Sequence, residues 1–100
     1  MTASLPPLQQ HDLDDEALDS LVRDLTQLAE ILEVRGKRGP GYATIEELPL
    51  HDAIGQLREQ LIRGVQIRYL FDGQEWLDTL IVTAAGIRLT RLLLDDRPVR

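Results

Sequence analysis

The feature that most constrains this chain is the dipeptide Asp72-Gly73, which lies between two stretches of alternating apolar and polar residues. Both central residues of a type I′ turn need positive φ angles, and Asp-Gly is one of the few pairs that tolerates them. The pattern is therefore typical of a tight antiparallel hairpin. If Asp72 and Gly73 form the turn, the facing pairs of the hairpin are Phe71 with Gln74, Tyr69 with Trp76, Ile67 with Asp78, and Val65 with Leu80.

A second turn is expected within residues 83–86, so that residues 64–94 form a three-stranded antiparallel meander. We place Ala85 and Gly86 in that turn, which makes Val82 face Leu89. One face of the meander then collects mostly apolar side chains, and this asymmetry predicts a sheet with helices on that face. The members of this face are Val65, Ile67, Tyr69, Trp76, Leu80, Val82, Ile87, Leu89 and Leu93.

Two helices are expected before the meander. From Asp14 onward, apolar residues recur at spacings of three and four as far as Leu32, which is the period of one helical face. The end of this helix is ambiguous, because the alternation after about Glu30 also fits a short strand near residues 32–36. A second helix is expected from about Pro49 to Arg63, with a glycine at position 64 as a natural stop.

Two glycine-containing features stand out in the same region. Residues 35–41, RGKRGPG, combine three glycines, a proline and three bases, which predicts a flexible loop. Gly55 falls inside the second helix, where glycine costs about 1 kcal/mol against alanine. Two explanations are open for Gly55, namely close packing against the first helix or the sheet, or simple tolerance of the cost.

The length and patterning predict one α+β domain of order α-α-β-β-β, with two helices packed on one face of the meander. We expect a disordered tail at residues 1–11, the domain at 12–94 and a C-terminal tail at 95–100. No run approaches the roughly 18 apolar residues of a membrane helix. The first residues also lack a signal-peptide pattern, so we expect a cytoplasmic protein without membrane contact.

The net charge of −6 lies almost entirely in the first third of the chain. An acidic surface repels phosphate backbones, so nucleic-acid binding is not expected. The chain has no cysteine and only two histidines, which are far apart in sequence, so we expect neither a metal site nor a cofactor. No catalytic constellation is visible, and we do not expect an enzyme.

Asp78 is the unusual residue of the predicted apolar face. A buried carboxylate is costly unless it is paired or hydrogen-bonded, and Arg91 lies on the same face of the third strand, within cross-strand or diagonal reach. One interpretation is a structural ion pair at the sheet margin; the other is a pocket acid with a raised pKa. The candidate pocket for a small ligand or anion consists of Tyr42, Tyr69, Trp76, Asp78 and Arg91.

Two further sites are candidates. Arg35, Lys37 and Arg38 could present cations and backbone amides to a phosphate, although the spacing is not that of a phosphate-binding loop and a solvated loop is the alternative. Five apolar residues lie on the face of the meander that should be polar, and they form a candidate interface. They are Leu70, Leu77, Ile81, Leu92 and Leu94.

These observations favour a small, non-catalytic interaction or accessory protein. We expect it to bind a protein partner or a second copy of itself, as a homodimer, through this second sheet face or the acidic first helix. The alternative explanation for the interface residues is that other segments of the same chain cover them. The alternative function is binding of a small ligand or anion near Trp76, Asp78 and Arg91.

Overall fold

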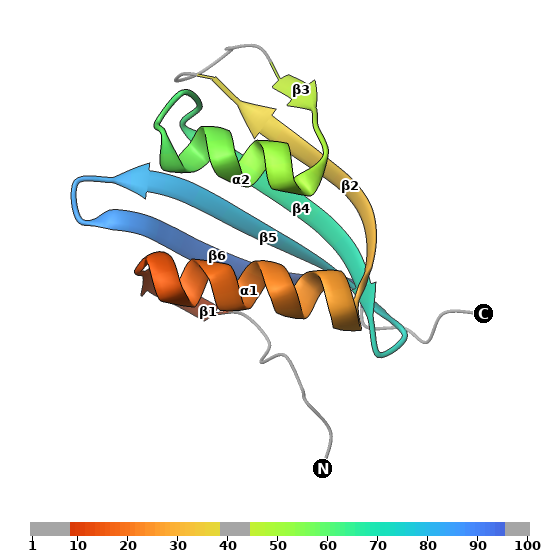
Figure 1. Cartoon of the computed structure of the whole chain (residues 1–100). Helices are drawn as coiled ribbons and strands as arrows, with labels where there is room; N and C mark the ends of the chain where they lie inside the picture. Colours follow the sequence, from red (N-terminus) through yellow and green to blue (C-terminus); the bar gives the residue numbers. More distant parts are fainter. Residues whose placement is uncertain (1–8, 39–44, 96–100) are drawn as a thin grey trace.

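A computed structural model describes residues 9–38 and 45–95 of the chain (Figure 1). These residues form one antiparallel sheet of six strands, in the order β1-β6-β5-β4-β2-β3, with two helices on one of its faces. The α+β class is confirmed, but the predicted three-stranded meander is too small, since three further strands extend it. The elements are β1 Gln9–Leu13, α1 Asp15–Leu28, β2 Glu30–Lys37, β3 Ile45–Glu47, α2 Leu50–Arg58, β4 Gly64–Phe71, β5 Gln74–Thr83 and β6 Gly86–Asp95.

The hairpin of β4 and β5 has the predicted register at every pair, from Val65 opposite Leu80 to Phe71 opposite Gln74. Asp72 and Gly73 both have positive φ angles, 56° and 76°. The turn therefore has the backbone conformation that the Asp-Gly pair indicates, and the register follows from it.

The second turn differs from the prediction. Thr83 faces Gly86 and Val82 faces Ile87, so the predicted pairing of Val82 with Leu89 is wrong by two residues. The reason is local, because the Thr83 hydroxyl accepts a hydrogen bond from the Ala85 amide and donates one to the Gly86 carbonyl, both at 3.2 Å. These bonds close the turn around Ala84 and Ala85. A shift of two residues leaves each side chain on its predicted face.

Strand β1 lies partly inside the segment that was predicted as a disordered tail. Leu13 faces Ile87 and Gln10 faces Thr90, so the strand extends the sheet beyond β6. The strand has the sequence QQHDL, which lacks the apolar alternation by which strands are recognised. Its pairing with β6 includes an ion pair between Asp12 and Arg88 at 3.2 Å.

Helix α1 ends at Leu28 and β2 follows at Glu30, so the strand alternative for this region is right, and the strand is longer than expected. The predicted flexible loop at residues 35–41 is wrong for residues 35–37, which belong to β2. Gly36 makes this possible, since a Cβ atom at this position would lie 2.9 Å from Leu48 Cδ1 and 3.1 Å from Ile62 Cδ1. Arg38 follows the strand, whereas residues 39–41 of the predicted loop and Tyr42 lie outside the described residues.

Helix α2 begins at Leu50, next to Pro49, as the proline indicated, but it ends at Arg58 rather than near Arg63. The chain reverses at Gln60, which has a φ of 59° and cannot continue a right-handed helix. The residues that follow still contribute to the core, because Ile62 is buried.

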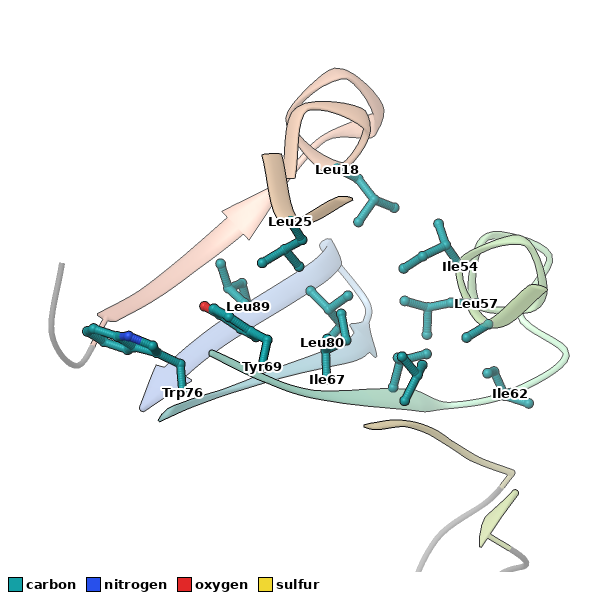
Figure 2. Close-up of a cluster of buried hydrophobic side chains, with 13 residues drawn as sticks. Leu18, Leu25, Ile54, Leu57, Ile62, Ile67, Tyr69, Trp76, Leu80 and Leu89 are labelled. Carbon is teal, nitrogen blue, oxygen red and sulfur yellow. The ribbon is translucent and has the colours of Figure 1, made fainter. Parts of the chain in front are cut away.

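The hydrophobic core lies between the helices and the sheet. Figure 2 shows Leu18 and Leu25 of α1 and Ile54 and Leu57 of α2 pointing toward the sheet. Both described helices lie on the same side, so we call the opposite side the outer sheet face. It carries Glu33, Arg35, Gln66, Arg68, Leu70, Glu75, Leu77, Thr79, Ile81, Arg88, Thr90, Leu92 and Leu94, with Gln10 and Asp12 of β1.

Candidate functional site

The predicted pocket residues Tyr69, Asp78 and Arg91 come together on three neighbouring strands, β4, β5 and β6. Arg91 faces Asp78 directly and donates from Nε to Oδ1 at 2.8 Å and from Nη2 to Oδ2 at 2.7 Å. The Tyr69 hydroxyl donates to Asp78 Oδ1 at 3.0 Å. The carboxylate thus accepts three hydrogen bonds, two of them from an opposite charge in bidentate geometry.

The electrostatics of this cluster follow from its burial. Asp78 has 0% of its surface exposed and Arg91 has 6%. Burial and the neighbouring Asp78 charge raise the pKa of Tyr69 well above its usual range, so the phenol stays neutral. Burial alone would lower the pKa of Arg91, but its hydrogen bonds and its attraction to Asp78 outweigh this and raise it. The result is a closed ion pair in the interior of the sheet, not at its margin.

Trp76 completes the same face and lies opposite Tyr69. Trp76 is 4% exposed, and its indole Nε1 is buried without a hydrogen-bond partner among the described residues. The cavities between α1 and α2, beside the turn between β5 and β6, and on the outer sheet face are lined by other side chains. The side chains of Tyr69, Trp76, Asp78 and Arg91 are packed into the core.

The three cations of the predicted anion loop lie at the end of β2 and directly after it, and two of them pair with carboxylates. Arg35 pairs with Glu33 at 3.0 Å, and Arg38 pairs with Glu46 at 3.0 Å. Lys37 is the last residue of β2, and its carbonyl accepts a hydrogen bond from the Arg63 amide. Two of the three charges are thus already neutralised by carboxylates of the same chain.

The five residues of the predicted interface all lie on the outer sheet face. Ile81, Leu92 and Leu94 are 39%, 42% and 44% exposed, and Leu70 and Leu77 are partly buried. Leu77 and Leu92 face each other on adjacent strands. Leu77 and Leu92 are the centre of what we call the apolar strip. It consists of Leu70 on β4, Leu77 and Ile81 on β5, and Leu92 and Leu94 on β6. Exposed apolar groups gathered in this way are typical of surfaces that bind another protein.

Charged residues on the outer sheet face pair with one another. Arg68 lies 2.7 Å from Glu75 and 3.6 Å from Glu33. The hydrogen bond to Glu75 is the main cause that raises the pKa of Arg68. Arg68 also borders, with Leu77 and Leu94, a shallow hollow of about 170 Å³ on this face. Because these ion pairs are internal to the chain, the face offers an apolar strip flanked by neutralised charge.

One feature was missed by the sequence reasoning. A groove of about 490 Å³ separates α1 from α2 on the helical side, and Arg23, His51, Ile54 and Gly55 are among the residues that line it. The sequence contains one indication of this groove, the helix-interior glycine Gly55, which has two possible explanations from the sequence alone. Its role depends on what lies opposite, which only the packing of the two helices reveals.

A metal site needs several ligands close together, and a membrane span needs a long apolar helix. Among residues 9–38 and 45–95, no three histidine, aspartate or glutamate side chains gather as metal ligands do. No helix in the same part of the chain has the length and apolarity to cross a membrane. Comparison with family models, curated proteins and solved structures finds no match to this chain.

Proposed function

We propose that this chain is a non-catalytic interaction protein that associates with a second copy of itself through the outer sheet face. The observation that carries the proposal is the apolar strip around Leu77 and Leu92 on a sheet whose described helices all lie on the other side. A sheet with one helical layer still has one face on which another layer can pack.

The charge distribution favours a second copy as the occupant. The two helices contain five acidic residues against the two arginines Arg23 and Arg58, so two copies of a protein with a net charge of −6 repel each other through their helical sides. On the outer sheet face, the three arginines Arg35, Arg68 and Arg88 are matched by the three carboxylates Glu33, Glu75 and Asp12. Two copies can approach through this face without meeting a net charge of the same sign.

The size of the face is adequate for a dimer. The four long strands β2, β4, β5 and β6 have eight to ten residues each. With strands about 4.8 Å apart and a rise of about 3.3 Å per residue, they span roughly 500 to 600 Å². The flanking strands β1 and β3 add further area. The whole face therefore approaches the roughly 800 Å² per partner that a standard interface buries.

Pairing through the sheet edges is the less favourable geometry. The edge strand β3 has three residues and β1 has five, so each offers few backbone groups to a partner strand. Short edge strands are a common means of preventing edge-to-edge association. The face therefore offers more contact area than either edge.

The test is sedimentation velocity over a series of protein concentrations, with two matched variants. Leu92→Lys places a charge in the apolar strip, whereas Leu28→Lys places the same charge at an exposed leucine on α1. We expect a concentration-dependent dimer for the natural sequence and for Leu28→Lys, and at least tenfold weaker association for Leu92→Lys, since burying a lysine without a partner is costly. A monomer at all concentrations, or equal association of both variants, would refute the proposal.

A further inference from the structure

The groove between α1 and α2 has features of a ligand site that are independent of the outer sheet face. The two helices run antiparallel, because Arg58 at the end of α2 pairs with Asp19 near the start of α1 (Figure 1). Arg23 and Gly55 both fall in the middle of the groove, one from each helix. The groove lies on the opposite side of the sheet from the outer face, so it can be occupied whether or not two copies associate.

The inner part of the groove is apolar. Val22 of α1 is half-buried and Ile54 of α2 is 5% exposed, and both line it. The volume of about 490 Å³ lies within the range of about 300 to 1,000 Å³ that is usual for small-ligand sites. The groove is thus large enough for a small organic molecule and has an apolar base for its body.

The rim of the groove is positive in a protein that is otherwise acidic. The basic residues of the two helices are Arg23, His51 and Arg58, and all three line the groove. The helices also contain five acidic residues, of which only Asp19 lines the groove. Asp19 and Asp15 both pair with Arg58, so Arg23 supplies the positive charge that is left for a ligand. Arg23 makes no ion pair with any residue in the described ranges, so its guanidinium is available to an anion.

Gly55 keeps the middle of the groove open. A Cβ atom at this position would have no atom within 4 Å, so the explanation that this glycine allows close packing is wrong. A helix-interior glycine costs about 1 kcal/mol against alanine. At this position the destabilisation is not offset by closer packing. A side chain larger than alanine would, however, project into the groove toward α1.

We propose that this groove binds a small monocarboxylate with an apolar body. The carboxylate pairs with the Arg23 guanidinium, whose planar fork matches two carboxylate oxygens, and the body packs on Val22 and Ile54. A single negative charge suits the site better than a phosphate dianion, because one unpaired arginine faces the ligand and the surrounding protein is acidic.

The test is a titration with octanoate and with phenylpropionate, followed by the backbone amide chemical shifts of the protein. We expect saturable shifts that are concentrated at Val22, Arg23, Ile54 and Gly55. Octan-1-ol, which has the apolar body without the charge, is expected to bind about fivefold or more weakly, because it forms no charge-assisted hydrogen bonds. No saturable shift with either acid, or equal binding of the alcohol, would overturn the proposal.

Three variants localise the binding. Arg23→Gln is expected to weaken octanoate binding about fivefold, whereas Arg63→Gln, which makes the same charge change at an exposed position away from the groove, leaves it unchanged. Gly55→Leu is expected to abolish binding without lowering the thermal midpoint, because leucine is a better helix former than glycine. Full affinity in Gly55→Leu or in Arg23→Gln would show that the groove is not the site.

Discussion

Asp78 lies in the interior of the sheet, and both oxygens of its carboxylate are occupied by hydrogen bonds from Arg91 and Tyr69. Such a pair adds little net stability compared with apolar residues of similar size, but breaking it leaves a buried charge without compensation. The three residues come from three adjacent strands. The cluster therefore also favours the one register that brings them together.

Removal of one charge from this cluster is expected to lower the stability of the fold far more than replacement of all three side chains by apolar ones. We expect Asp78→Asn to lower the free energy of unfolding by about 3 to 5 kcal/mol, because it leaves Arg91 buried and unpaired. The triple variant Tyr69→Phe, Asp78→Val, Arg91→Leu is expected to recover most of that loss. Urea denaturation of both variants measures the difference, and a triple variant less stable than Asp78→Asn would contradict this account.

Tyr69 makes stability depend on pH in the alkaline range. Its pKa is raised in the folded protein by burial and by Asp78, so the folded state holds the phenolic proton more tightly than the unfolded chain does. The contribution is fully present below the unfolded-state pKa of about 10 and is lost as the pH rises above that value. We expect the urea midpoint to fall more steeply between about pH 9 and about pH 11 than in Tyr69→Phe. Equal slopes in the two proteins would refute this role of Tyr69.

At the scale of single elements, the hairpin of β4 and β5 could be predicted residue by residue because its information is local. Asp72 and Gly73 determine the turn, and the turn determines every pair that follows. The second turn is one residue earlier than predicted, which shifts the pairing by two residues, because the Thr83 hydroxyl closes it and such bonds are not visible in the alternation of residues. Strand β2 was foreseen only in part, since its glycine resembles a loop until Leu48 and Ile62 are seen to pack against it.

Two glycine-to-alanine changes separate backbone conformation from packing. An added Cβ atom would meet no atom within 4 Å at either Gly55 or Gly73, but Gly73 has a φ of 76°. We expect Gly73→Ala to lower the free energy of unfolding by about 1 to 2 kcal/mol, since the left-handed conformation is strained for alanine. We expect Gly55→Ala to raise it by about 0.5 to 1 kcal/mol.

The check is thermal or urea denaturation of the two variants beside the natural sequence. Both sites have open space around them. If the two substitutions change the free energy of unfolding in opposite directions, the cause can only be the backbone conformation. A destabilising Gly55→Ala would mean that the groove side of α2 is more crowded than the distances indicate.

At the scale of the whole molecule, the sequence was sufficient for the class and for the layer arrangement. The apolar face of the meander required helices on one side, and both helices lie there. The strands β1 and β3 could not be predicted, because both are short, and β1 is a polar edge strand recognisable only by its partner. The same holds for the groove, which depends on the distance between two helices that are far apart in sequence.

The candidate pocket of Tyr69, Trp76, Asp78 and Arg91 also shows that the sequence does not predict how distant elements pack. The alternation of residues placed Asp78, Arg91 and Tyr69 on one face and within reach of each other, although the predicted second turn would have set Asp78 opposite Leu93 rather than Arg91. Whether such a cluster lines a cavity depends on how the helices cover it. The structure shows these side chains buried in the core, and the groove lies instead between the two helices, at residues the sequence had not marked.

The pairing of β1 with β6 also has a consequence for synthesis. A ribosome produces the N-terminal strand early, yet its partner is among the last strands of the sheet to be made. During this interval β4 and β5 can already form their hairpin, whose contacts are local and therefore fast to form. Strand β1 therefore stays without its partner until β6 has been made, and its polar residues favour a soluble, unaggregated segment during that interval.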